Sequence, residues 1–178
     1  MRLTSTAAGT YDFGKIDKSK HTGKITYTDV DSSNGFWMFE ASGYGVGNGT
    51  FKSAPFKGIA DTGTTLAMLP TTVVQTYYKA VRGAKIDQQQ GGYVFPCSAN
   101  VPDFVMGVGK DKTIKITVPG KFIKYAPTDA TGKTCFGGIQ TDEGIGFSIL
   151  GDIVLKAAFV VFDASGETPR LGWAKKKL

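Results

Sequence analysis

The 178-residue sequence has one histidine, His21, two cysteines, and no long apolar run. A lone histidine in a lysine-rich polar stretch argues against a histidine-dependent serine or cysteine hydrolase. The longest uncharged apolar run, residues 157–162, is far shorter than the roughly 20 residues of a membrane span, and no apolar signal segment stands at the N-terminus. We therefore expect a soluble chain with no membrane partner.

Acidic residues are fewer than basic ones, 15 against 21, which gives a formal net charge of +6. The lysines are spread along loops and strand faces and are not clustered with arginines and aromatics, so we expect no nucleic-acid partner. Long stretches with helical periodicity are also missing. With 24 glycines and 12% aromatic residues, the composition favours short half-buried strands between turns. The sequence predicts an all-β fold and a single domain over residues 1–178.

Alternating apolar and polar residues predict several strands. Residues 10–16 and 23–30 read as a hairpin with a polar turn between them. The glycine-rich residues 43–49 lack the spacing of a dinucleotide-binding loop and indicate a bulged or strongly bent strand. Further short strands are predicted for residues 91–97, 103–109, 112–118, 121–126 and 134–140.

Two helical segments are predicted. Residues 71–82 place apolar side chains at spacings of three and four, with Thr71 or Thr72 as the N-cap and Gly83 at the end. Residues 152–156 read as a short helical turn between strands. Helix is therefore a minor part of the expected fold.

Cys97 and Cys135 would close a loop of 38 residues. Neither has a second cysteine or a histidine at a spacing that suits zinc, so we favour a disulfide between them. In the chain-entropy model such a bridge contributes on the order of 3–4 kcal/mol. It also indicates that the protein originates in an oxidising compartment.

Residues 48–50, Asn-Gly-Thr, match the acceptor pattern for N-linked glycosylation. Such a short match often arises by chance. It has meaning only for a chain that passes through a eukaryotic secretory route.

Asp61 stands in the stretch "GIADTGTTLAMLP", among small and apolar residues. An ionised carboxylate there costs free energy unless hydrogen bonds compensate it. Thr62, Thr64 and Thr65 supply hydroxyl groups, and Gly63 lets the backbone turn sharply. From these residues alone, a structural buried aspartate and a functional one are about equally consistent with the pattern.

Beyond this triplet, the sequence resembles the C-terminal lobe of fungal pepsin-like aspartic proteases of the penicillopepsin and endothiapepsin type. The resemblance covers nearly the whole chain from about Thr10. It rests on motifs in the family's order: "TYDFGKID", "GFW", "GIADTGTTL", "GGYVFPCS", "CFGGIQ", "GIGFSILGDI" and "AAFVVFD". It implies a β-rich lobe in which the Asp61 loop packs against residues 149–151, with Cys97 bonded to Cys135.

The resemblance also implies the chemistry. Asp61 would be one of two catalytic aspartates, Thr62 would form a hydrogen bond to its counterpart in the other lobe, and Thr64 would brace the carboxylate. Two such carboxylates share one proton, so that one activates a water molecule and the other acts as acid towards the peptide carbonyl. No metal and no cofactor takes part.

Substrate contacts follow from the same resemblance. Gly63 and Thr65 would lie along the substrate backbone, and Ile59 and Ile153 would help to line side-chain pockets. Asp152 would have a structural role as the cap of the short helix.

The sequence has a single Asp-Thr-Gly, and the nearest internal imitation, "DASG" at residues 163–166, differs at its second position. We therefore expect that one chain cannot assemble the pair and is inactive alone. The family is secreted, so the parent protein is expected to be extracellular. Because the lysine-rich surface departs from the acidic character usual in such proteases, we expect an engineered, isolated lobe.

Two other readings stay open. Two copies could pair about a twofold axis, as retroviral proteases do, and form a weak acid endopeptidase. Alternatively, the chain is a non-catalytic folding or binding module. The expected partner is accordingly an N-terminal lobe or a second copy, with a protein or peptide substrate only once a second lobe is supplied.

Overall fold

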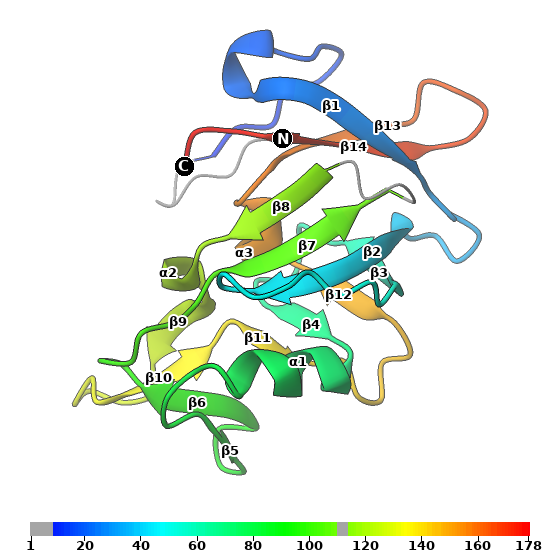
Figure 1. The fold of residues 1–178 in the computed structure, drawn as a ribbon. Coiled ribbons are helices and arrows are strands. Elements are labelled where there is room, and N and C mark those ends of the chain that lie inside the picture. The colour runs from blue at the N-terminus through cyan, green and yellow to red at the C-terminus, as the bar shows by residue number, and fades with distance from the viewer. Residues whose placement is uncertain (1–8, 110–113) are drawn as a thin grey trace.

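Three β-sheets follow one another from the top to the bottom of Figure 1 in a computed structural model that describes residues 9–109 and 114–178. In order across each sheet, the three-stranded sheet contains β1 (Thr22–Asp29), β14 (Arg170–Lys175) and β13 (Phe159–Asp163). The seven-stranded sheet contains β11 (Ile139–Thr141), β4 (Ala67–Leu69), β12 (Ser148–Leu150), β3 (Phe56–Ala60), β2 (Met38–Val46), β7 (Phe104–Val108) and β8 (Ile114–Val118). The four-stranded sheet contains β5 (Lys85–Asp87), β6 (Gly92–Pro96), β10 (Thr134–Gly137) and β9 (Lys124–Pro127).

Helices are short and few between these strands. They are α1 (Thr71–Tyr78), α2 (Gly120–Ile123), α3 (Asp152–Leu155) and the 3₁₀ helix η1 (Lys18–Lys20). Within the described part of the chain, no helix has the length and apolar character needed to cross a membrane. The β-rich lobe predicted from the sequence is confirmed, and the predicted turn at residues 152–156 corresponds to α3.

An aromatic cluster joins α1 to the two larger sheets. The ring of Tyr78 stacks on Tyr93 at 4.2 Å between centroids and meets Tyr77 edge-to-face at 5.2 Å. The Tyr78 hydroxyl donates a hydrogen bond of 2.7 Å to the carbonyl of Ile139, and burial raises the pKa of this phenol. This cluster fixes β4, which precedes α1, and so fixes one end of the segment that carries Asp61.

The start of α1 differs from the prediction. Pro70 occupies the N-cap position, and no side chain caps the helix, so neither Thr71 nor Thr72 has the predicted role. The Thr71 hydroxyl lies 2.7 Å from that of Thr141, at the end of β11. The Thr71 hydroxyl is thus engaged in a contact between α1 and β11 and does not cap the helix.

The end of α1 also differs, since the helix stops at Tyr78 and not at Arg82. Beyond it, the amides of Ala80 and Val81 donate to carbonyls three residues back, at 3.0 and 3.1 Å, so the chain tightens into 3₁₀-type turns. Val81 is still buried, which is why the apolar spacing extended past the helix. Gly83 turns the chain with a φ of 77°.

The hairpin predicted for residues 10–16 and 23–30 does not form. β1 pairs antiparallel with β14, and Tyr27 lies opposite Gly172. A Cβ atom at Gly172 would lie 2.8 Å from the Tyr27 ring, so glycine is needed for this pairing. Gly14 has a φ of 74°, which interrupts an extended conformation. The alternation in residues 10–16 therefore does not mark a strand.

Two other strand predictions have different outcomes. The glycine-rich residues 43–49 do bend the sheet: the register of β2 against β7 shifts between Ala41 and Gly43, and Gly43 has a φ of 145°. Residues 121–126, by contrast, are strand only in their second half. The first half belongs to α2, where a Cβ at Gly120 would lie 1.8 Å from the Val101 carbonyl oxygen.

The predicted disulfide is confirmed. Cys97, directly after β6, is bonded to Cys135 in β10, with 4.9 Å between the Cα atoms. The Lys124 ammonium donates a hydrogen bond of 2.6 Å to the carbonyl of Cys97. The bridge therefore ties together the strands at the edge of the molecule furthest from β1 in Figure 1.

Candidate active-site loop

The loop that carries Asp61 connects β3 to β4, and β12 lies between these two strands. β12 runs parallel to β3, with Leu150 opposite Ala60, and antiparallel to β4, with Leu150 opposite Ala67. The loop therefore has to pass over the end of β12. The Asp61 amide donates to the carbonyl of Leu150 at 3.2 Å, which holds the loop at that point.

Gly151 makes this crossing possible. A Cβ atom there would lie 2.3 Å from the carbonyl oxygen of Thr64, closer than any side chain tolerates. The next two amides, of Asp152 and Ile153, donate to the carbonyls of Thr64 and Thr65 at 2.8 and 3.0 Å. The packing of the loop against the apolar-apolar-glycine segment, predicted from the resemblance, is present in the structure.

The carboxylate of Asp61 is partly exposed, so it is not the buried structural aspartate that the apolar neighbours suggested. Its Oδ1 accepts a hydrogen bond of 2.8 Å from the amide of Gly63, and its Oδ2 accepts one of 2.6 Å from the hydroxyl of Thr64. Thr62 and Thr65 are exposed. The loop thus orients one carboxylate and leaves two hydroxyl groups facing outwards.

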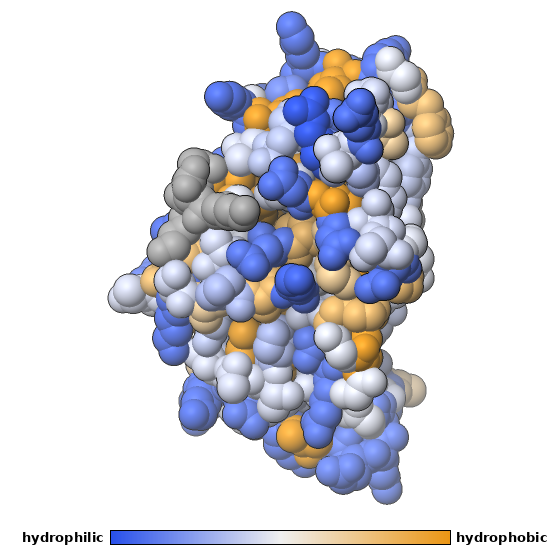
Figure 2. Space-filling model, turned by 90° about the vertical axis from the view of Figure 1, so that its right-hand side faces the viewer, coloured by the Kyte–Doolittle hydropathy of each residue, from blue (hydrophilic) through white to orange (hydrophobic). Residues whose placement is uncertain are grey.

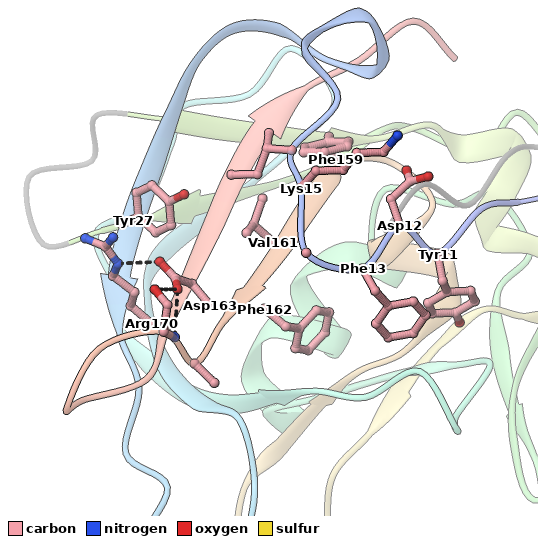
Figure 3. A pocket seen from close by; sticks show the side chains of 14 residues that line it. Tyr11, Asp12, Phe13, Lys15, Tyr27, Phe159, Val161, Phe162, Asp163 and Arg170 are labelled. Atoms are coloured by element: carbon pink, nitrogen blue, oxygen red, sulfur yellow. Dashed lines mark hydrogen bonds and ion pairs between the residues drawn. The ribbon is translucent and has the colours of Figure 1, made fainter.

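Aromatic side chains surround this carboxylate. The pocket that contains Asp61 and Thr62 is lined by five of them, named here the aromatic rim: Tyr11, Phe13, Phe36, Trp37 and Phe162. Phe13 is 89% exposed, and Trp37 packs edge-to-face on Phe162 at 5.1 Å. Figure 3 shows the adjoining groove, where the Phe162 ring points towards Phe13.

The aromatic rim was not among the site residues predicted from the sequence. Phe13 and Phe36 stand in glycine-containing stretches, and the alternation of residues 10–16 predicted a half-buried strand there and not a surface beside Asp61. Without the fold, nothing in the sequence placed these two segments beside Asp61.

The predicted cap at Asp152 is wrong. Gly151 is the N-cap of α3, and no side chain caps the helix. The Oδ1 atom of Asp152 is buried and has no hydrogen-bond partner in the part of the chain that the structure describes. Burial raises the pKa of Asp152, the charge of Asp61 adds to this, and Lys156 opposes it. Asp152 is thus a second carboxyl group whose pKa is affected by the charge of Asp61, but it does not line the Asp61 pocket.

Ile59 and Ile153 have different positions. Ile59 lines the Asp61 pocket with a small exposed fraction of 5%. Ile153 has no exposed surface, because α3 packs it against the chain at Gly138. The structure therefore brings Ile59, and not Ile153, to the surface around Asp61.

Chemically, the loop offers one oriented carboxylate in an apolar setting. Within residues 9–109 and 114–178, no three side chains of the metal-ligating types are grouped closely enough to hold an ion. Among the residues that line the pocket, Asp61 is the one acid. A single carboxylate can accept a proton from water, but a second group must then supply the acid for peptide cleavage.

Comparison with known proteins places these features in one family. Residues 1–176 match the family model described as "Eukaryotic aspartyl protease". The chain is 58% identical over 168 residues to aspergillopepsin-1 of Aspergillus fumigatus, and 55% identical over 168 residues to penicillopepsin-3 of Penicillium janthinellum. It is 58% identical over 174 residues to penicillopepsin-1 of Penicillium rubens.

These alignments cover 94–98% of this chain but only 41–42% of the three relatives. The chain therefore spans about two fifths of the length of the curated relatives that it matches. The family match includes the Asp61 loop, the disulfide and the glycine at which the loop crosses β12. From its sequence and its fold, the chain belongs to the eukaryotic aspartyl protease family.

Proposed function

We propose that this chain is the C-terminal half of an aspartic endopeptidase, that Asp61 is one of its two catalytic aspartates, and that the half alone does not cleave peptides. The observation that carries the proposal is the geometry of the Asp61 carboxylate. It is held by the Gly63 amide and the Thr64 hydroxyl, and it stays open to solvent in a pocket that has no other acid.

The proposed chemistry needs a second carboxylate close to Asp61. Two carboxylates a few ångströms apart cannot both be ionised easily, so they hold one proton between them. The ionised member takes a proton from the attacking water, and the protonated member supports the developing charge on the peptide carbonyl. Because Asp152 keeps Oδ1 buried beneath the loop, it is not in a position to serve as this partner.

Within this proposal the other loop residues have distinct roles. The exposed Thr62 hydroxyl would donate a hydrogen bond to the facing loop of the second lobe. Gly63 and Thr65 would contact the substrate backbone, and Ile59 would contact a substrate side chain. The aromatic rim would become covered by the second lobe or by substrate, which agrees with the high exposure of Phe13 in this chain.

The proposed partner is an N-terminal lobe, and the proposed location of the parent protein is extracellular. The Cys97–Cys135 disulfide supports a secretory origin, because such bridges persist in oxidising compartments. The family to which the chain belongs supports the same location.

The test is reconstitution. The chain is mixed with the separately produced N-terminal portion of penicillopepsin-1 or aspergillopepsin-1, and cleavage of an unfolded protein is followed near pH 4. We expect cleavage only in the mixture, and its loss when the mixture contains Asp61→Asn. Cleavage that survives this substitution would show that Asp61 is not catalytic.

A second candidate function is an acid endopeptidase made of two copies of this chain. The exposed rim around Asp61 is the observation that favours it, since two such faces could bury one another. Figure 2 shows several separate apolar areas between hydrophilic side chains on the face at the right of Figure 1, and the charge of +6 opposes self-association. A dimer in light scattering, with cleavage abolished by Asp61→Asn in the chain alone, would favour this candidate.

The third reading, a non-catalytic folding or binding module, predicts a different set of results. The chain would be monomeric, would keep its fold after Asp61→Asn, and would not acquire cleavage activity from an N-terminal portion.

A further inference from the structure

We infer that Asn48 is a site of N-linked glycosylation, on a turn at the far end of the sheet from Asp61. The inference rests on the proposed secretory route and is independent of the proposed catalytic role of Asp61. Its starting observation is the Asn-Gly-Thr sequence at residues 48–50. The three asparagines of the chain are Asn34, Asn48 and Asn100, and only Asn48 has a threonine or serine two positions later.

The turn leaves the acceptor accessible. Asn48, Gly49 and Thr50 are all exposed. Across the part of the chain that the structure describes, neither the Asn48 amide group nor the Thr50 hydroxyl forms a side-chain hydrogen bond. Both groups that an oligosaccharide transferase must recognise therefore face solvent and are not used by the fold.

The turn does not depend on the Asn48 side chain for its shape. Tyr44 and Lys52 exchange backbone hydrogen bonds of 3.0 and 2.7 Å and close the loop. The Gly49 amide donates to the carbonyl of Val46 at 2.9 Å, and Gly47 turns the chain with a φ of 53°. Backbone bonds and glycines define the turn, so it can carry a bulky group at Asn48 without rearranging.

The position of the turn keeps an oligosaccharide away from the Asp61 pocket. Met38 pairs with Ile59, two residues before Asp61, and β2 then runs away from that point to Val46. Eight steps at about 3.3 Å each give an upper limit of roughly 25 Å between the two ends of β2, which the bend at Gly43 shortens. A glycan at Asn48 would therefore leave the aromatic rim uncovered.

The disulfide, which supports the proposed secretory route, indicates the same compartment. The oxidising lumen in which the Cys97–Cys135 bridge forms is the compartment in which N-linked transfer takes place. The co-reactant is a lipid-linked diphospho-oligosaccharide. The Asn48 amide nitrogen bonds to the anomeric carbon and loses one proton. The bond from that carbon to the diphosphate oxygen breaks, and the lipid diphosphate leaves with the bonding electrons.

The test uses the full 178-residue chain, directed by a secretory leader into the medium of a yeast host and analysed by intact mass and peptide mapping. We expect one oligosaccharide, on Asn48, which peptide N-glycosidase removes. Asn48→Gln and Thr50→Ala should abolish the added mass, whereas Thr50→Ser should retain it. Secreted chain with the disulfide formed and with Asn48 unmodified would overturn the inference.

A second measurement separates this inference from the proposed function. Glycosylated chain and enzymatically deglycosylated chain are compared in the reconstitution assay. We expect the same cleavage rate from both, because the turn lies far from the pocket. A cleavage rate that rises severalfold on deglycosylation would contradict the placement of Asn48 far from the pocket, whatever the outcome of the Asp61→Asn control.

Discussion

Asp61 and Asp163 each stand at the end of a strand, and each accepts a hydrogen bond from the backbone amide two residues further along. In both, a nearby hydroxyl adds a second bond: Thr64 to Asp61 at 2.6 Å, and Ser165 to Asp163 at 2.6 Å. The local turn is therefore nearly the same in "DTGT" and "DASG". What differs is the partner of the Oδ2 atom, which is the Thr64 hydroxyl in Asp61 and the Arg170 guanidinium in Asp163, where both Ser165 bonds go to Oδ1.

Asp163 meets a cation and Asp61 does not. Arg170 on β14 donates to the Oδ2 of Asp163 at 2.8 Å, as Figure 3 shows. The Ser165 hydroxyl and amide, together with Arg170, lower the pKa of Asp163 to about 2. Among the described residues, no lysine or arginine forms an ion pair with Asp61. Because the Asp163 carboxylate is already paired with Arg170, it is not available for chemistry, whereas the Asp61 carboxylate remains available.

The two loops also differ in how closely the backbone is packed beneath them. Gly151 stands under the Asp61 loop, where an added Cβ would lie 2.3 Å from a carbonyl oxygen. At Gly166, in the Asp163 loop, the nearest atom to such a Cβ would be 3.8 Å away. The Asp61 loop is therefore fixed by the core, while the Asp163 loop is an ordinary surface hairpin.

The largest effect is expected from Gly151→Ala. The added methyl group must displace the backbone of the Asp61 loop or of β12, which we expect to lower the free energy of unfolding by at least about 3 kcal/mol. Gly166→Ala is the matched control and should change it by less than about 0.5 kcal/mol. Urea denaturation of both variants measures the difference. Equal stabilities would mean that the close packing at Gly151 has no energetic consequence.

Removing the hydroxyl that supports each carboxylate tests the second difference. Thr64→Val keeps the shape of the side chain but removes its bond to Asp61, with an expected loss of about 1–2 kcal/mol at pH 7. Ser165→Ala should cost less, because the Ser165 amide and Arg170 still bind Asp163. The comparison again uses urea midpoints. A larger loss for Ser165→Ala would reverse the proposed ranking of the two loops.

The pH dependence of stability should distinguish the effect of Asp163 from that of Asp152. The folded pKa of Asp163 lies near 2, below its usual value of 3.8, so its contribution to stability is present above pH 3.8 and is lost as pH falls towards 2. Asp163→Asn should therefore destabilise the chain more at pH 6 than at pH 2. Burial raises the pKa of Asp152, so ionising it costs stability as pH rises above 3.8.

The opposite sign is therefore expected for Asp152→Asn. This variant should gain stability relative to the unmodified chain between pH 3 and pH 7, while Asp163→Asn should lose it. Thermal unfolding at several pH values measures, for each variant, how its stability difference from the unmodified chain changes with pH. If this difference changed in the same direction for both variants, the assigned environments of these carboxyl groups would be contradicted.

The Asp61 loop could be predicted from sequence because its geometry depends on a few residues with strict requirements. Gly151 tolerates no side chain, and the Thr64 hydroxyl donates to the carboxylate three residues before it. The disulfide could likewise be predicted from the sequence, since the chain has only two cysteines. The resemblance to a family supplied the motifs and their order along the chain, and from it the Asp61 loop was expected to pack against residues 149–151.

The failed predictions concern contacts that join distant segments. Thr71 bonds to Thr141 instead of capping α1, and β1 pairs with β14, where Gly172 leaves room for Tyr27, and not with residues 10–16. Local propensity carries no information on either choice. The aromatic rim was missed for the same reason, because Phe13 and Phe36 meet only in the folded chain.

The smallest effect on the chain itself is expected at Thr62. Its side chain is exposed, and within residues 9–109 and 114–178 its hydroxyl forms no hydrogen bond. Thr62→Val should therefore change the free energy of unfolding by no more than about 0.5 kcal/mol, as should Thr117→Val on the exposed face of β8. In the mixture with an N-terminal portion, only Thr62→Val should slow cleavage, by roughly tenfold, the loss expected for one hydrogen bond near a charged group. Equal cleavage rates for the two variants would show that Thr62 does not reach across to a second lobe, because neither substitution is expected to change the fold of the chain.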